Sequence, residues 1–347
     1  MGKDVMMQLR QRWITLSLIF LVTLFCLGCS LNSAVEPKSY KETQFLMDTV
    51  IEITAYGPNA ETAVKVAFVE FKRLHDITDR FSPDSQVSRI NQLAGKEKVV
   101  VDPDLYAMIA RSNALSDRLD GVFDVSIGPL TSLWGIGHKG EFVPSDNELK
   151  QVLPLVNYRQ IELDPTAKTV YLSREGMLLD LGGIAKGYAT DKAVEILKSH
   201  GITSALVNAG GDVRVIGQKP DKKPWRIGVQ DPRNSEKVIA KLALTDWDTM
   251  ETSGDYQRYF MKDQIRYSHI LDPRTGMQPR EIISVTTVNS NSGDGDILGT
   301  AIFVLGIERG LELLKQFPGT DAIIITNDGR IITTPGLRGK VELAGQD

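Results

Sequence analysis

Cysteine is scarce in this chain, and what there is lies near the N-terminus. The two cysteines are Cys26 and Cys29, so residues 30–347 contain none. This excludes a disulfide, a thiolate metal site and a cysteine nucleophile from the body of the protein. Histidine is also scarce, with four residues, which leaves few candidates for a general base.

Neither sign of charge dominates the sequence. Lys and Arg together number 40, Asp and Glu number 44, and the formal net charge is −4. A nucleic-acid-binding surface needs basic residues clustered on one face, and the sequence contains no such cluster. We therefore expect no nucleic-acid partner.

Long hydrophobic runs are absent except near the N-terminus, where basic residues precede the apolar run Trp13–Leu27. The run ends at Cys29 and resembles a bacterial lipoprotein signal, with cleavage before Cys29 and lipidation of its thiol. An uncleaved anchor is the alternative, although the run is short against the roughly 20 residues of a spanning helix. We expect residues 1–29 to be a signal peptide, residues 30–44 a flexible tether, and the body to be exported and held at a membrane through its lipid.

The remaining residues, 45–347, alternate between strand and helix periodicity and are long enough for one elaborate domain or two lobes. Strand patterns mostly follow one another with helices between them, which favours an α+β fold with mixed, largely antiparallel sheets and packed helices. The pattern predicts helices over Ala60–Thr78, Leu105–Leu119 and from about Ala185 and Asp296 onward. It predicts strands over Met47–Tyr56, Ser204–Asn208, Val213–Ile216, Trp225–Gln230, Thr252–Phe260, Ile265–Leu271 and Ile283–Val288.

The segment Leu179–Tyr188, with the sequence LDLGGIAKGY, is predicted to run from an apolar strand through a Gly-Gly turn into a helix. Paired glycines let backbone N–H groups approach a ligand, and a helix start attracts anions. Lys186 falls in the first helical turn, where a cation is unfavourable unless an anion is bound nearby. The segment therefore predicts an anion-binding site, with a simple connector and a solvated lysine as the alternative.

A second candidate site follows Gly293, where Asp296 and Thr300 are four residues apart at the start of a predicted helix and so lie on one face. A carboxylate and a hydroxyl held together are ligands that suit Mg²⁺. The alternative is that Asp294 or Asp296 is an N-cap. The metal interpretation gains weight only if this face meets the Gly-Gly turn.

His269 lies on a predicted strand beside apolar Ile270 and is the best-placed general base among the four histidines. A structural histidine is the alternative, and Asp255 is the second candidate for the base. His75, His138 and His200 have no catalytic partner in the sequence pattern.

Nine segments, taken in order, resemble the FAD:protein FMN transferase (ApbE) family. They are Met47–Thr49, Phe81–Ser85 running on to Asn91, Gly121–Leu130, Leu133–Gly135, Leu179–Tyr188, Val207–Asp212, Ser253–Tyr256, Ser268–Gly276 and Asp296–Gly306. The resemblance implies a tandem T-fold-like architecture. It also implies an enzyme that cleaves the FAD diphosphate with Mg²⁺, attaches FMN through a phosphoester to a Ser or Thr of an acceptor flavoprotein, and releases AMP.

The resemblance also implies roles for individual residues. The FAD site would be formed by Met47, Phe81, Val122, Phe123, Asp124, Asp180, Lys186 and Ile270. Mg²⁺ would be held by the carbonyls of Gly183 and Gly299 and by the side chains of Asp296 and Thr300. His269 would be the base for the acceptor hydroxyl.

Two positions depart from the family pattern. The usual Met-Gly-Thr is Met47-Asp48-Thr49 here, which places a carboxylate beside the nucleotide site. The usual Ala-Asp-Ala-Leu-Ala-Thr is Gly295-Asp296-Ile297-Leu298-Gly299-Thr300, which keeps both side-chain ligands.

Two other functions fit the same residues. An FAD pyrophosphatase would use the same cation and turn, with water in place of the acceptor hydroxyl. An FAD-binding or storage lipoprotein would bind the nucleotide without cleaving it. Among acceptors, the resemblance implies flavoproteins of exported or membrane electron-transport complexes, and no feature of the sequence selects one of them.

Overall fold

The structure is a computed structural model that describes Met6 and residues 38–137, 140, 142–245 and 247–344. Apart from Met6, the expected signal peptide with Cys29 lies outside the described residues, as do most of the expected tether and His138. Residues from Lys38 onward form one compact unit. None of the helices in the described ranges has both the length and the apolar character needed to cross a membrane.

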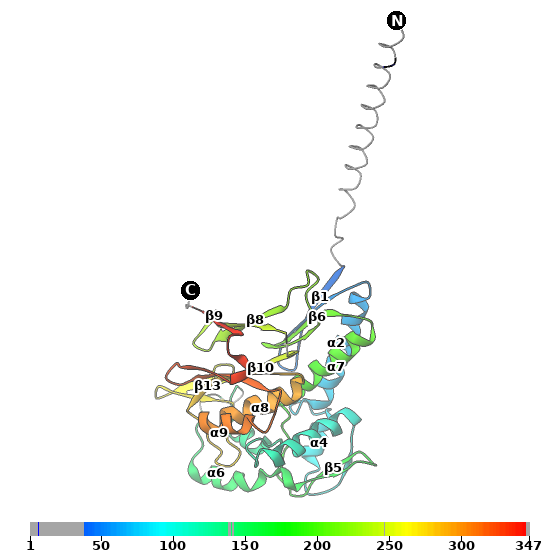
Figure 1. Cartoon of the computed structure of the whole chain (residues 1–347). Coiled ribbons are helices and arrows are strands. Elements are labelled where there is room, and N and C mark those ends of the chain that lie inside the picture. The colour runs from blue at the N-terminus through cyan, green and yellow to red at the C-terminus, as the bar shows by residue number, and fades with distance from the viewer. Residues whose placement is uncertain (1–5, 7–37, 138–139, 141, 246, 345–347) are drawn as a thin grey trace. The chain divides into compact units, whose positions relative to one another are not determined.

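An eight-stranded antiparallel sheet forms the centre of the molecule (Figure 1). Its strand order is β1-β2-β6-β7-β10-β13-β14-β15. The strands are β1 (Ser39–Leu46), β2 (Thr49–Tyr56), β6 (Ser204–Ala209), β7 (Asp212–Ile216), β10 (Thr249–Gly254), β13 (Ile282–Asn289), β14 (Asp321–Thr326) and β15 (Ile331–Thr333). The expected α+β fold with largely antiparallel sheets is confirmed.

Helices cover one face of this sheet. They are α2 (Ala60–Thr78), α7 (Ala185–Ser199), α8 (Ser292–Leu305) and α9 (Ile307–Leu314), and α7 packs against both α2 and α8. The apolar residues that recur at helical spacing in α2, such as Val64, Phe71 and Leu74, are all buried in the main core.

A smaller sheet packs on the opposite face. It has the order β16-β9-β8, with β8 at Trp225–Asp231, β9 at Asn234–Leu244 and β16 at Val341–Leu343. Trp225 and Leu242 share a hydrophobic cluster with Val288 of β13. Because layers cover it on both sides, β13 is buried at all eight positions.

The rest of the chain forms a helical region and two small sheets (Figure 1). The helices are α3 (Gln86–Gln92), α4 (Pro103–Arg118), α5 (Gly128–Trp134) and α6 (Asp146–Val152), with short 3-10 turns at Leu153–Leu155, Tyr158–Gln160 and Pro335–Leu337. One sheet joins β3 (Val99–Val100), β5 (Thr169–Leu172) and β4 (Ile161–Asp164). The other pairs β11 (Tyr259–Lys262) with β12 (Ile265–Ser268).

The segment expected to be a tether is structured from Ser39, so the boundary placed at residue 45 was wrong for residues 39–44. Ser39 to Leu46 pair in antiparallel register with Tyr56 to Thr49. The polar side chains of this segment suit an edge strand, in which one face remains in water. This explains why composition suggested a linker.

Three predicted strands end in different places. Leu179–Leu181 is not a strand, because the side chain of Asn91 bonds both backbone groups of Leu179 in place of a neighbouring strand. The run Thr252–Phe260 is split between β10 and β11, and β12 ends at Ser268, so His269 follows the strand. Met47 and Asp48 form the turn before β2, with positive φ of 52° and 58°.

Candidate active site

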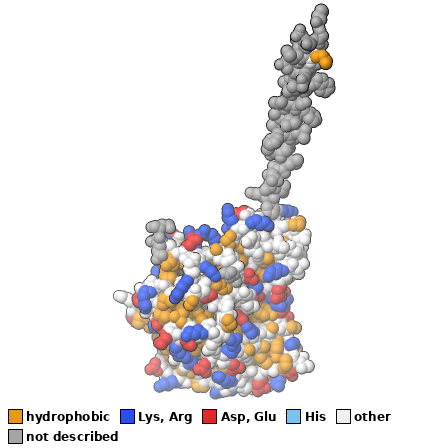
Figure 2. Space-filling view, viewed as in Figure 1, with side chains coloured by type: hydrophobic (Ala, Val, Ile, Leu, Met, Phe, Trp, Pro, Cys, Tyr) orange, Lys and Arg blue, Asp and Glu red, His pale blue; other side chains and the backbone are white. Residues whose placement is uncertain are grey.

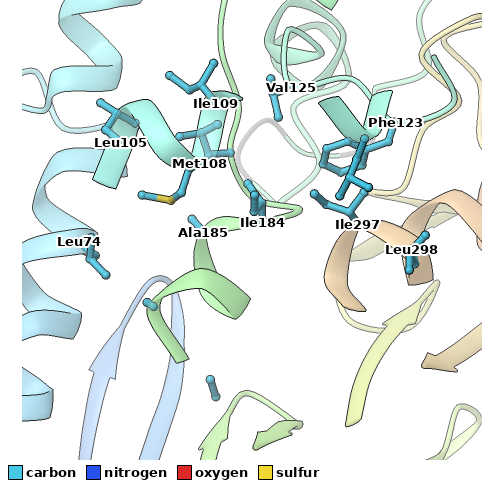
Figure 3. Packing of buried hydrophobic residues seen from close by; sticks show 14 of the residues in the cluster. Leu74, Leu105, Met108, Ile109, Phe123, Val125, Ile184, Ala185, Ile297 and Leu298 are labelled. Atoms are coloured by element: carbon cyan, nitrogen blue, oxygen red, sulfur yellow. The ribbon is translucent and has the colours of Figure 1, made fainter. Parts of the chain in front are cut away.

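The Gly-Gly turn leads into α7, and core packing fixes its position. Ile184 and Ala185 lie among buried residues of α4, while Phe123 faces Ile297 of α8 (Figure 3). A Cβ built on Gly183 would lie 2.8 Å from the ring of Phe123. Glycine is therefore required at residue 183 by close packing, and the turn stays open on its other side.

Asp296 of α8 meets the first turn of α7. Its Oδ2 accepts the backbone N–H of Gly187 at 2.9 Å, and its Oδ1 lies 3.2 Å from the Lys186 ammonium. The two segments predicted as separate sites, more than a hundred residues apart in sequence, are therefore one site. Neither Asp294 nor Asp296 is the N-cap of α8, since Asn291 caps that helix.

Lys186 also forms an ion pair with Asp212, the first residue of β7. Asp212 is 3% exposed, and its other oxygen accepts the backbone N–H of Thr252 at 2.7 Å. The ammonium thus lies between two carboxylates at a helix start. These carboxylates offset the unfavourable interaction of a cation with the helix dipole.

The oxygen atoms expected to hold a cation belong to these same elements. Thr300 lies one turn after Asp296 on α8, with its hydroxyl 3.3 Å from that of Ser253. Gly183 precedes α7, and no described residue donates a hydrogen bond to its carbonyl. Among the described residues, no three His, Cys, Asp or Glu side chains lie together in a way that could hold a metal ion by themselves. One carboxylate, a hydroxyl and carbonyls fit Mg²⁺, which completes its coordination with water and substrate phosphates.

Asp180 lies on the other side of the turn and is held by three donors. Its Oδ2 accepts from Arg80 at 2.8 Å and from the Thr131 hydroxyl at 2.9 Å, and its Oδ1 accepts the N–H of Gly182 at 3.0 Å. Asp180 therefore fixes the shape of the Gly-Gly turn. Arg80 was missed by the sequence analysis, and its position next to Phe81 was the only available signal.

Arg80 also lines an open cavity of about 380 Å³ beside this network. The cavity is lined by Arg80, Ser88, Asn91, Gln92, Ser132 and Leu178.

The loop containing Val122, Phe123 and Asp124 is tightly built. Asp124 is buried and accepts hydrogen bonds from the N–H and hydroxyl of Ser126 and from the N–H of Tyr158. Burial raises the pKa of Asp124, and these bonds oppose the shift. The side chains of Val122 and Phe123 are also buried, so any contact of this loop with a ligand would come from its backbone.

Phe81 and Met47, two further expected nucleotide contacts, differ in exposure. Phe81 is 60% exposed, with the Arg80 guanidinium 4.7 Å from its ring centroid. Met47 is partly buried in the turn between β1 and β2. The unusual Asp48 beside it forms an ion pair with Arg258 at 2.8 Å, so its negative charge has a partner within the protein.

His269 is suited to accept a proton. Burial and the nearby charge of Arg258 lower its pKa from 6.5 to about 4, which keeps the imidazole neutral at pH 7. Its Nδ1 lies 3.3 Å from the carbonyl of Arg258. A carbonyl only accepts, so Nδ1 carries the proton and Nε2 keeps its lone pair. Asp180 and Lys186 lie near enough to act on its pKa.

Asp255 has a different environment, and the structure favours His269 over it as the base. Arg233 donates to both carboxylate oxygens of Asp255, at 2.7 and 2.8 Å. Arg266 adds a second positive charge at 3.8 Å. Ile270, next to His269, is buried.

A buried carboxyl group lies behind the site. Glu251 of β10 is 1% exposed and accepts a hydrogen bond from Thr249 at 2.9 Å. Burial and the charge of Asp296 raise its pKa well above the ordinary value. The sequence analysis missed Glu251, because a glutamate within a strand pattern gives no sign that it is buried.

The fold and the site together define an α+β protein in which the start of α7, Lys186 and the side chains of Asp296 and Asp212 meet. A model of the ApbE family matches residues 47–324. The chain therefore belongs to the ApbE family, as the sequence segments predicted.

Curated relatives and solved structures agree with this assignment. The chain is 33% identical to an FAD:protein FMN transferase of Treponema pallidum, over 92% of this chain and 94% of that protein. It is 37% identical to one of Klebsiella pneumoniae, over 84% and 91%. A crystal structure of the ApbE protein from Thermotoga maritima superposes with a TM-score of 0.81 and 35% identity, covering 87% of this chain and 99% of that one.

Proposed function

We propose that this protein is an FAD:protein FMN transferase that cleaves the FAD diphosphate with Mg²⁺ and attaches FMN to a Ser or Thr of an acceptor flavoprotein. The names of the curated relatives support the reaction. The observation that carries the proposal is the contact of Asp296 with Lys186 and with the first turn of α7. It joins a group of cation ligands to an anion-binding helix start, and phosphoryl transfer depends mainly on such positioning and charge neutralisation.

Different residues would bind the cation, the diphosphate and the rest of FAD. Asp296 and Thr300, with the carbonyls of Gly183 and Gly299, would hold Mg²⁺, which neutralises charge on the phosphate oxygens when bound. Lys186 and the start of α7 would bind the diphosphate. The surrounding contacts to FAD would come from Met47, Phe81, the loop Val122–Asp124, Asp180 and Ile270.

His269 would take the proton from the acceptor hydroxyl at Nε2. The hydroxyl oxygen attacks the phosphorus of the FMN half, a new phosphoester bond forms, and the bond from that phosphorus to the bridging oxygen breaks. AMP leaves with the bridging oxygen. The lowered pKa of His269 keeps the imidazole neutral at pH 7, which supports this role.

We also propose that the protein is exported and lipid-anchored through Cys29, and that its acceptor belongs to an exported or membrane electron-transport complex. The support is the sequence pattern around Trp13–Leu27. Labelling of cells with a fatty-acid analogue tests this, because Cys29→Ser should abolish incorporation into the protein.

One assay separates the transferase from the two alternatives. The body from residue 38 is incubated with FAD, Mg²⁺ and a candidate acceptor, and protein-bound flavin fluorescence is followed on a denaturing gel. A fluorescent acceptor band with release of AMP supports the transferase. Free FMN and AMP without a labelled acceptor indicate a pyrophosphatase, and intact FAD indicates storage.

Asp296→Ala should abolish turnover while FAD binding survives at least in part, because the substitution removes a cation ligand and leaves the contacts to the flavin. The matched control is Asp294→Ala on the same helix, where the carboxylate pairs with Arg111 at 2.8 Å outside the site. Normal turnover in Asp296→Ala would refute the assignment of the cation ligands. Loss in both variants would indicate damage to α8 itself.

A further inference from the structure

Asp212 is not among the residues expected to hold the cation, yet its side chain is 4% exposed, against 10% for Asp296. Asp212 opens β7 directly after the turn at Gly210 and Gly211, where both residues have positive φ (66° and 103°). The backbone of Thr252 on the neighbouring strand fixes one oxygen of Asp212, and the other oxygen faces the Lys186 ammonium. The carboxylate therefore has a set orientation before any ligand arrives.

The same ammonium lies 3.2 Å from Asp296 Oδ1. Any cation that binds Asp296 competes with Lys186 for this carboxylate, since two positive charges repel each other at that distance. A buried Asp212 without its lysine would be an uncompensated charge, which is costly. Lys186 is therefore bound more strongly by Asp212 than by Asp296.

We infer that Asp212 is a positioning residue that holds the Lys186 ammonium at the start of α7, so that a divalent cation can displace it from Asp296 without displacing it from the site. Asp296 is thereby left for the divalent cation, and Lys186 for the diphosphate. This inference rests on the proposed function, because it assigns a task to Asp212 within that site.

In a simpler alternative, Asp212 acts only through its negative charge. The two roles predict opposite changes in the FAD affinity of Asp212→Asn. If only the charge matters, Asp212→Asn removes a charge that repels the diphosphate, and FAD binds more tightly. If Asp212 positions Lys186, the ammonium in the same variant pairs with Asp296 alone, and FAD binds more weakly.

Asp212→Asn is a suitable substitution because the amide oxygen still accepts the Thr252 N–H and the side chain keeps its shape. The variant is tested in two binding experiments without acceptor: Mg²⁺ titrated calorimetrically in the absence of FAD, and FAD titrated by flavin fluorescence in the absence of Mg²⁺. We expect both affinities to fall, each by about tenfold, which corresponds to the loss of one ion pair of about 1.4 kcal/mol. Unchanged or tighter FAD binding would overturn the inference.

Two further variants guard against loss of folding as the cause. Asp321→Asn is the matched control, since Asp321 accepts hydrogen bonds from Gly336 and Thr334 in another part of the same sheet, and both affinities should stay as in the wild type. If Asp212→Asn does not fold, Lys186→Gln approaches the pair from its other end. That variant should bind Mg²⁺ more tightly without FAD and bind FAD more weakly, and weaker Mg²⁺ binding would overturn the inference.

The wild-type titrations separate this inference from the proposed function. If the wild type binds neither Mg²⁺ nor FAD, the proposed function itself fails. If the wild type binds both and Asp212→Asn leaves FAD binding intact, only the role of Asp212 is refuted.

Discussion

At Gly187, α7 approaches the start of α8 closely, and replacing this glycine with alanine should damage the site more than the fold. A Cβ at residue 187 would lie 2.4 Å from the carbonyl oxygen of Ser292 and 2.8 Å from Asp296 Oδ2. The first neighbour is backbone at the start of α8, so the clash can be relieved only by moving that helix.

The expected change in stability follows from two opposing effects. Alanine in a helix is better than glycine by up to about 1 kcal/mol. Overpacking a buried contact costs about 1–3 kcal/mol, and backbone contacts place this position at the upper end. We therefore expect Gly187→Ala to lower the free energy of unfolding by about 1–2 kcal/mol, a fall of a few degrees in Tm.

Gly187→Ala should affect the binding of Mg²⁺ more strongly than it affects the stability of the protein. Moving α8 separates Asp296 from the N–H of Gly187, which holds its carboxylate at 2.9 Å. Positioning errors of about 1 Å in such sites cost up to about a hundredfold in activity. Calorimetric titration with Mg²⁺ should therefore show clearly weaker binding at a temperature where the variant is still folded.

Gly293, in the first turn of the facing helix, provides the matched control. A Cβ there would have its nearest neighbours at 3.5 Å or more, which is ordinary contact. Gly293→Ala should keep both stability and Mg²⁺ affinity. If Gly187→Ala is as stable as the wild type and binds Mg²⁺ equally well, the close approach of the two helices is not what fixes Asp296.

Two further predictions concern the turn and the base. Asn91→Ala leaves both backbone groups of buried Leu179 without their side-chain partner. The free energy of unfolding, measured in urea, should therefore fall by about 2–4 kcal/mol. As a control, Asn59→Ala at an exposed position should change it by no more than about 0.5 kcal/mol. The pKa of His269 falls from 6.5 to about 4 on folding, so the unfolded chain binds a proton between these pH values that the folded protein does not. This contribution to stability is fully present above pH 6.5 and is lost as the pH falls to 4, and His269→Gln should reduce the slope of unfolding free energy against pH in that window. An unaltered slope would show that His269 titrates normally.

Much of the architecture could be predicted because it depends on local periodicity. The helix Ala60–Thr78 ends where the apolar spacing predicted, and the strand Trp225–Asp231 differs from its prediction by a single residue. The errors arose where a partner distant in sequence decided the outcome. Asn91 replaced a neighbouring strand at Leu179, and β2 gave the polar residues of β1 a strand to pair with.

The same distinction holds for the site. Glycine pairs, a lysine in a first helical turn and a carboxylate four residues from a hydroxyl are local patterns, and they identified both halves. Arg80 and Glu251 were missed because their importance depends on burial and on partners from other elements. The task inferred for Asp212 depends equally on Lys186 and Thr252, which are distant in sequence.

The two halves of the site are held together because α7 and α8 each supply an aspartate that accepts backbone N–H groups at the start of the other helix. The residue that precedes α7 gives it no side-chain cap, and Asp296 of α8 accepts the N–H of Gly187 instead. In return, Asp191 of α7 accepts the N–H groups of Ser292 and Gly293 at the start of α8, at 3.0 and 3.2 Å.

Each helix start therefore depends on a carboxylate from the other helix, and a cap of this kind contributes about 0.5–2 kcal/mol. This arrangement has a consequence for ligand binding. A cation that binds Asp296 Oδ1 takes the place of the Lys186 ammonium there, while Oδ2 keeps the N–H of Gly187. Binding of the cation and binding of the diphosphate should therefore favour each other, because the first frees the ammonium that the second requires.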